Sequence, residues 1–126
     1  MSYADKIRVA SFDLKTADMA GTPADNADLF AILIPANREV EIYGFQGLVR
    51  LAGAASSKME LCDASSNLLA AISVASTGVQ KDTTRTFPIR YKAGTSDTYL
   101  KLRVDGTLDA TTDVTFEVLL SEPFKA

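Results

Sequence analysis

The stretch YLKLRVDGTLDATTDVTFEVLLSE, residues 99 to 122, contains two runs in which apolar and polar residues alternate strictly. In each run the apolar residues would share one face and the polar residues the other. Such period-two alternation is typical of β-strands that have one face in a core and one face in water. We therefore predict two strands, with these residues pointing inward: Leu100, Leu102, Val104, Val114, Phe116 and Val118.

The connection between these two strands decides the topology. Asp105-Gly106 is a strong hairpin signal only if the alternation resumes at once, but TLDATTD intervenes. A connection of that length can cross from one sheet to another, as a jelly roll requires. We predict this crossing. In the alternative, a hairpin, Lys101 would face Glu117 in a cross-strand pair.

Six further runs have strand character and are separated by turn residues: 6–14, 29–34, 40–53, 57–63, 68–75 and 85–92. Eight short strands at near-regular spacing predict an all-β fold, a two-sheet antiparallel β-sandwich with jelly-roll-like topology. A chain of 126 residues forms a single domain, residues 1–126. The run SSNLLAAISVAS also has some helical propensity, but its Ile72, Ser73 and Val74 favour a strand.

Local irregularities are predicted in three of these strands. Ile7 and Val9 are out of phase with Phe12 and Leu14, which indicates a bulge near Ser11. Gly44 and Gly47 are expected bend points of a long strand. In the run 85–92 we expect Phe87 and Ile89 to be buried, and Pro88 makes this strand an edge or occupies an unpaired position.

Composition excludes several kinds of partner. Thirteen basic and sixteen acidic residues give a net charge of −3, and no basic cluster is present, so we expect no nucleic-acid partner. No run reaches the eighteen or more apolar residues of a membrane helix, and the amino terminus lacks the apolar region of a signal peptide. We therefore expect synthesis in a cytoplasm and no membrane partner.

Few residues in the chain are suited to chemistry. It has no histidine, and its one cysteine, Cys62, is expected to be packed and inert. Loop aspartates gather in two clusters, a feature that also occurs in calcium sites, but aspartate is equally a common turn residue, and we favour the turn role. These clusters are Asp18, Asp25 and Asp28, and Asp105, Asp109 and Asp113. We predict no enzymatic activity, no catalytic residue, no cofactor and no metal site.

The amino-terminal MSYADKIRVASFDL, which leads directly into a strand, and the carboxy-terminal YLKLRVDGTLDATTDVTFEVLL resemble the decoration, or cement, proteins of tailed-bacteriophage capsids. The richness in Ala, Thr, Ser and Asp is similar as well. This resemblance implies a non-enzymatic structural protein on the capsid exterior of a virion, made in the host cytoplasm. It would bridge subunits of the major capsid protein as a homo-oligomer, either a dimer or a trimer.

The chain ends carry the predicted partner-binding residues, which are Tyr3, Phe124 and Lys125. Phe124 follows Pro123, which ends the last strand, and either folds back onto the body or inserts into a neighbouring molecule. We expect residues 1–6 and 121–126 to be ordered only by contact with another copy or with a capsid protein.

An alternative function is a carbohydrate- or receptor-binding β-sandwich module of a phage or bacterial adhesion apparatus. The absence of tryptophan counts against stacking on sugar rings, although tyrosine can substitute for it.

Overall fold

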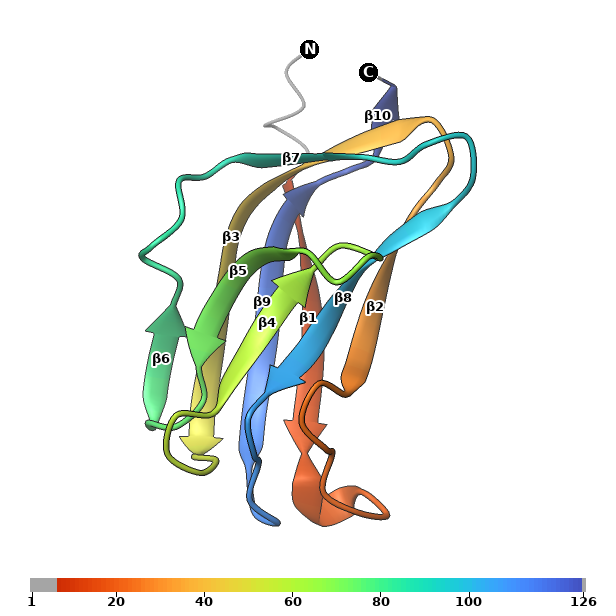
Figure 1. The fold of residues 1–126 in the computed structure, drawn as a ribbon. Coiled ribbons are helices and arrows are strands. Elements are labelled where there is room, and N and C mark those ends of the chain that lie inside the picture. The colour runs from red at the N-terminus through yellow and green to blue at the C-terminus, as the bar shows by residue number, and fades with distance from the viewer. Residues whose placement is uncertain (1–6, 126) are drawn as a thin grey trace.

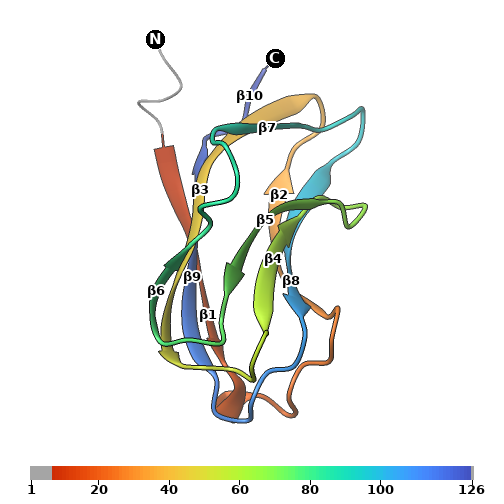
Figure 2. The same ribbon diagram turned by 60° about the vertical axis from the view of Figure 1, so that its left-hand side comes forward.

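The structure is a computed structural model that describes residues 7–125 and contains two antiparallel β-sheets packed face to face (Figures 1 and 2). A short 3-10 helix, Thr16–Asp18, follows the first strand. The strands are β1 (Ile7–Lys15), β2 (Asp28–Ile34), β3 (Arg38–Leu51), β4 (Lys58–Cys62), β5 (Leu68–Ser73), β6 (Gly78–Lys81), β7 (Ile89–Lys92), β8 (Thr98–Asp105), β9 (Asp113–Ser121) and β10 (Phe124–Lys125).

The strand order confirms the two-sheet sandwich and its jelly-roll topology. The six-stranded sheet, called sheet A below, runs β1-β9-β3, with β10, β6 and β7 also paired to β3. The four-stranded sheet, sheet B, runs β2-β8-β4-β5. Because β8 and β9 belong to different sheets, the predicted crossing between them is confirmed and the hairpin alternative is wrong. Lys101 accordingly pairs with Asp28 and Glu117 with Gln46.

The core lies between the sheets and contains the residues predicted from the alternating runs. Leu100, Leu102, Val104, Val114, Phe116 and Val118 are all fully buried. The rings of Phe45 and Phe116 stack at a centroid distance of 6.3 Å near the middle of this core. On the side where β1 lies over β2, Phe12 and Phe30 stack at 5.0 Å and join the two sheets.

The predicted strand 85–92 is shorter than expected. It begins only at Ile89, and both Phe87 and Ile89 are half-buried, so the prediction of burial is wrong for these two residues. The Asp82 carboxylate accepts the N–H groups of Thr84 and Arg85 and turns the chain out of the sheet. Pro88 has no N–H to donate and lies outside the strand.

Strand β1 has no bulge, so that prediction is wrong. Its nine residues pair with β9 without any register shift, from Ile7 opposite Ser121 to Lys15 opposite Asp113. Leu14 faces the core, and the alternation continues back through Phe12 and Ala10 to Arg8. Ile7 and Val9 therefore lie on the outer face of sheet A, where they are 48% and 52% exposed.

The long strand β3 has a register shift between Ile42 and Gly44, which confirms a bend at Gly44. Gly47 has a different role. It is buried on the inner face, where a Cβ atom would approach the Ile72 Cδ1 atom to 2.8 Å. Gly47 therefore allows close packing between the sheets instead of a bend.

Strands β4 and β5 form the hairpin that the polar connection between them indicated. Asp63 Oδ1 accepts the N–H groups of Ser65 and Asn67, and its Oδ2 accepts the Asn67 side-chain amide. Burial raises the pKa of Asp63, but these hydrogen bonds outweigh it and hold the pKa below its usual value. Residues 68–73 are a strand, and no helical turn forms there.

Candidate functional site

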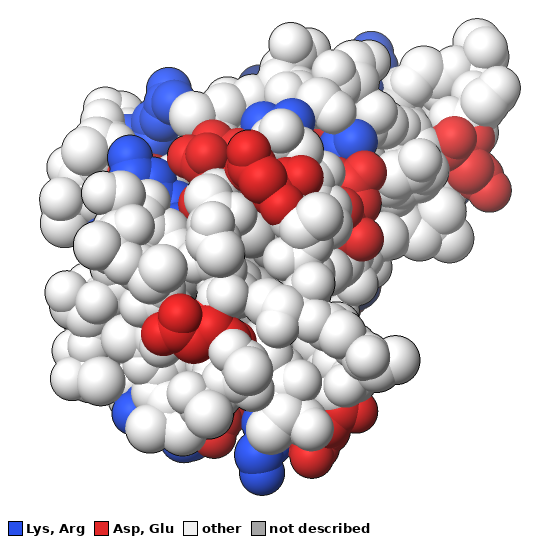
Figure 3. Space-filling model, turned by 60° about the horizontal axis from the view of Figure 1, so that its bottom comes forward, with Lys and Arg blue, Asp and Glu red and all other residues white. Residues whose placement is uncertain are grey.

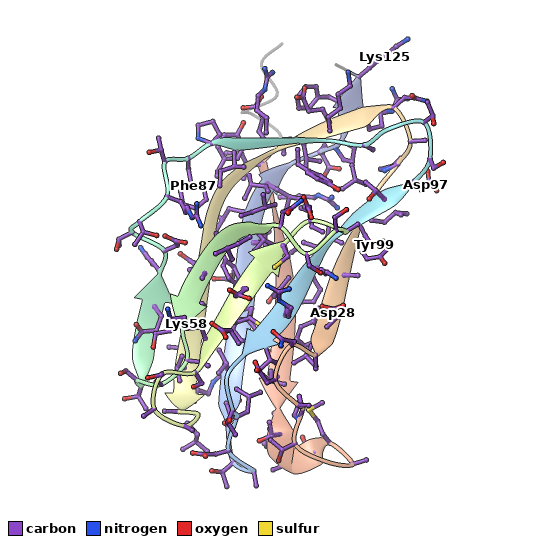
Figure 4. All side chains as sticks on the ribbon, viewed as in Figure 1. Asp28, Lys58, Phe87, Asp97, Tyr99 and Lys125 are labelled. Carbon is purple, nitrogen blue, oxygen red and sulfur yellow. The ribbon has the colours of Figure 1, made fainter. Side chains whose placement is uncertain are left out.

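Two of the three predicted partner-binding residues lie in the described part of the chain; Tyr3 lies outside it. Phe124 is only 7% exposed and pairs with Glu39 of β3, so it folds back onto its own domain. Lys125 is exposed and points away from the body of the molecule (Figure 4). The prediction that residues 121–126 become ordered only by contact with another molecule is therefore wrong for Ser121, Phe124 and Lys125.

The carboxyl-terminal segment folds back because it continues the ladder that β9 makes with β3. After Ser121 the chain passes Pro123 and pairs with the first two residues of β3. The Ser121 hydroxyl also accepts the Glu41 N–H at 2.9 Å. An apolar ring such as Phe124 gains free energy by burial on its own domain, so no second molecule is needed to hold it.

The loop aspartates serve turns and ion pairs. Asp25 accepts the Gly106 N–H at 2.8 Å and so connects the two aspartate-rich loops. Asp28 pairs with Lys101 at 3.1 Å, and Asp113 pairs with Arg50 at 3.2 Å. Within residues 7–125, no group of three or more Cys, Asp and Glu side chains is placed to hold a metal ion.

The outer face of sheet B carries a row of paired charges. Arg103 donates through Nε and Nη2 to one Glu60 oxygen, at 3.1 and 2.8 Å, and these bonds raise the pKa of Arg103. Lys101, which pairs with Asp28, is only 9% exposed. Cys62 lies opposite Lys101 and is fully buried; burial raises the pKa of its thiol, as expected for an inert cysteine.

An exposed apolar pair continues this face beyond the charges. Leu33 of β2 lies directly opposite Tyr99 of β8, and the two side chains are 60% and 46% exposed. Next to them, Ala31 is exposed opposite Lys101. Figure 4 shows Tyr99 and Asp28 on the side of the molecule where β8 and β2 lie. We call Ala31, Leu33 and Tyr99 the β2–β8 surface.

A cavity of ≈ 320 Å³ adjoins the β2–β8 surface. Its lining includes Tyr99, Ala31 and the Asp28–Lys101 ion pair. The register shift between Asp28 and Phe30 displaces the start of β2 at this point. The surface thus combines apolar side chains, a phenol and a fixed ion pair, which is a composition suited to contact with another protein.

The outer face of sheet A carries two further apolar pairs. Val9 lies opposite the half-buried Leu119, with Ile7 two residues along β1. Lower on the same face, Leu48 of β3 lies opposite Val79 of β6, and these side chains are 43% and 63% exposed. Exposed apolar pairs thus occur on both outer faces of the sandwich.

A cavity of ≈ 230 Å³ lies beside the connection between β6 and β7. Tyr43 and Phe87 contribute aromatic rings to it, and Gln46 and Lys81 contribute polar groups. The Gln46 amide donates to Glu117 at 2.8 Å, and the Tyr43 hydroxyl donates to Glu41 at 3.2 Å. Partial burial, followed by the charge of Glu41, raises the pKa of Tyr43.

A third cavity, of ≈ 310 Å³, lies at the side where β1 faces β2. Leu14, Leu29, Phe30 and Met19 contribute its apolar surface. Asp13, Lys15 and Asp18 also line it, so apolar and charged groups adjoin here.

Sequence reasoning missed the exposed apolar pairs because it assigned hydrophobic residues to the core. Tyr99 did carry a signal, since a residue next to the buried Leu100 in an alternating strand points outward. Leu33 carried none, because it belongs to the continuous apolar run LFAILI, in which either face is possible.

The surface seen from the lower end of the molecule is mostly uncharged, with acidic and basic side chains in small groups (Figure 3). No helix within residues 7–125 is long and apolar enough to cross a membrane. No family model, no curated protein and no solved structure matched the chain.

Proposed function

We propose that this chain is a non-enzymatic structural protein that decorates the exterior of an icosahedral phage capsid and stabilises it by bridging major capsid protein subunits. The observation that carries the proposal is the presence of exposed apolar cross-strand pairs on both outer faces of one small sandwich. A bridging protein needs at least two separate contact surfaces. Jelly-roll sandwiches occur in viral capsid proteins, and in lectins as well, so the architecture is compatible with the proposal without deciding it.

The β2–β8 surface is the contact with the shell. Tyrosine supplies a large apolar area together with a hydroxyl, and it is enriched among the residues that dominate binding energy. The Asp28–Lys101 pair beside it is already formed in the free protein, so binding does not have to order these two side chains.

Weak individual contacts are sufficient for this function. A protein that binds only the assembled shell stabilises that state by a free energy that grows with the logarithm of its concentration relative to its dissociation constant. Several contacts within one oligomer raise the overall affinity without a strong single site.

Co-sedimentation with undecorated capsids tests the proposal. The capsids are assembled from the major capsid protein whose gene lies nearest to the gene for this chain. The wild-type chain is expected to sediment with them at saturable stoichiometry. Tyr99→Ala and Leu33→Lys should each weaken binding about tenfold, which corresponds to about 1.4 kcal/mol for a contact of this kind.

Leu51→Lys is the matched control, because Leu51 is 51% exposed at the last residue of β3 and lies outside the β2–β8 surface. It should bind like the wild type. If the wild-type chain did not bind the capsids, the proposed function would be contradicted. If all three variants bound equally well, the β2–β8 surface would not be the contact.

A specific observation also favours the adhesion module as a second candidate. The cavity beside Tyr43 and Phe87 places two aromatic rings next to amide and ammonium groups. Aromatic rings suit the apolar C–H face of a sugar ring, and amide and ammonium groups suit its hydroxyls. Titration of a monosaccharide panel, monitored by amide chemical shifts, should move the signals of Tyr43 and Gln46 if this candidate is right, and leave them unchanged if it is wrong.

A further inference from the structure

We infer that β1 joins two copies of this chain into a symmetric dimer, in which the two β1 strands pair antiparallel about a two-fold axis at Val9. Sheet A would then continue from one copy into the other. The inference deepens the proposed function, because it names the surface that builds the oligomer, but its test requires no capsid.

Strand β1 offers an open hydrogen-bonding edge. Its nine residues pair with β9 on one side only, and no described residue pairs with the other side. The strand has no bulge and no proline along its length. An edge with these properties is a template for pairing with another strand, and proteins that remain monomeric usually obstruct such an edge.

The other sheet edges are obstructed. On β5, the N–H of Ala71 donates to the Asp82 side chain at 2.7 Å. On β2, the register shift between Asp28 and Phe30 interrupts the strand near its start, and Pro35 follows its last residue. The far edge of sheet A consists of two four-residue strands, β6 and β7, separated by residues 82–88. Strand β1 alone among these edges is long and regular.

The outward side chains of β1 suit contact with a second copy. Ile7 and Val9 are about half exposed, and Val9 adjoins Leu119 on β9. Beyond Leu119 lies Gly44, so the apolar strip extends across three strands of sheet A. Ser11, the next outward residue of β1, is small and uncharged.

The choice of a second copy follows from the pattern of β1 itself. An axis at Val9 places Val9 opposite Val9 of the second copy and Ile7 opposite Ser11, so the apolar residues meet. Arg8, whose Nε atom is buried without a hydrogen-bond partner, would then lie opposite the small Ala10. An axis at Arg8 would oppose two guanidinium groups, and an axis at Ser11 would set Val9 opposite Asp13.

Sedimentation equilibrium over a concentration series tests the dimer. The wild-type chain should change from monomer to dimer mass in the micromolar range, because paired edge strands bury less area than a standard interface of about 1,600 Å². Val9→Lys should raise the dissociation constant at least tenfold. Leu33→Lys, at a similarly exposed position on the other sheet, should leave the dissociation constant unchanged. Circular dichroism establishes that each variant is folded.

Cysteine substitution tests the register. A directly opposed pair has Cα atoms about 4.5–5.5 Å apart, within the range of a disulfide. Val9→Cys should therefore form a disulfide-linked dimer under mild oxidation. Ile7→Cys and Ser11→Cys should not, because an offset of four residues separates each from its equivalent by about 13 Å. Cys62 does not interfere because it is fully buried.

A monomeric mass at all concentrations would overturn the inference, as would cross-linking through Ile7→Cys or Ser11→Cys in preference to Val9→Cys. The result is separable from the proposed function. A monomer that still binds capsids would overturn only the dimer, and a dimer that binds no capsid would overturn only the capsid role.

Discussion

At the scale of single residues, Gly47 governs how closely the two sheets approach. A Cβ atom at this position would lie 2.8 Å from Ile72 Cδ1 and 3.3 Å from Phe116 Cδ1. Both neighbours belong to the packed core and have little room to move. The absence of a side chain at one position of β3 thus determines the packing of β5 against sheet A.

Gly47→Ala should therefore destabilise the protein by about 1–3 kcal/mol through overpacking of the core. The measurement is a denaturant titration that gives the free energy of unfolding. Gly44→Ala is the matched control, because its Cβ would meet only Leu119 Cδ1, at 3.7 Å. The control should be neutral or slightly stabilising. Equal effects of both substitutions would mean that the close approach at Gly47 carries no cost.

At the scale of elements, Asp82 connects the segment after β6 to the free edge of β5. Its Oδ2 accepts the Ala71 N–H, and its Oδ1 accepts the Thr84 N–H, the Thr84 hydroxyl and the Arg85 N–H. Burial raises the pKa of Asp82, but these bonds outweigh it, and the pKa is below its usual value.

A carboxyl whose pKa is lower in the folded state stabilises the fold above its unfolded-state pKa, and this contribution is lost as the pH falls through the folded-state pKa. Asp82→Asn should therefore lower the free energy of unfolding by about 1.5–3 kcal/mol at pH 7. The difference from wild type should shrink below about pH 4. Denaturant titrations from pH 7 to pH 2 measure it.

Asp109→Asn is the control for this pH series, because its exposed carboxylate makes no hydrogen bond among the described residues. It should leave the free energy of unfolding within about 0.5 kcal/mol of wild type. If the free energies of unfolding of Asp82→Asn and wild type instead differed by the same amount from pH 7 to pH 2, that result would contradict the stabilising role of the charged Asp82 carboxylate.

The two-residue strand β10 should contribute to the stability of the isolated domain. Deletion of residues 123–126 removes the buried Phe124 ring and its pairing with β3. We expect a loss of about 1.5–3 kcal/mol from the ring alone, measured by thermal and denaturant unfolding. Lys125→Ala, at an exposed position, should have little effect. Unchanged unfolding of the truncated chain would show that Phe124 does not anchor the terminus.

The elements that the sequence predicted are those with strict alternation and a buried face. Strands β8 and β9 and the crossing between them follow from residues 99–122 alone, because alternation reports burial directly. Strand β1 was predicted with a false bulge because Ile7 and Val9 are apolar yet exposed. Strands β6 and β10 were missed because they are short and depend on pairing with β3, which is distant in sequence.

The candidate surfaces were less predictable than the core. The burial of a core residue can be predicted from the alternation in its own strand. An exposed apolar residue can be recognised as part of a contact surface only when its cross-strand neighbour is known. The opposition of Leu33 and Tyr99 depends on the register of two strands that lie about 65 residues apart, and no local pattern encodes that register.

At the scale of the whole molecule, sequence-distant segments form the principal contacts of the sandwich. The first described strand, β1, pairs with β9, and Ile7 lies opposite Ser121. Strand β2 pairs with β8 in the other sheet. Among the strands described within residues 7–125, only β4 and β5 are consecutive and pair directly with each other.

This strand order has a consequence for folding on the ribosome. Strand β1 leaves the ribosome before β9 and has no partner until residues 113–121 have been synthesised, so the β1–β9 part of sheet A cannot form before then. Chains with such long-range pairing fold in about milliseconds to seconds, because loop closure must precede the contacts that stabilise it. During that interval both edges of β1 are open. The strand that joins two folded copies in the inferred dimer is therefore also the segment most exposed to premature pairing between incompletely folded chains.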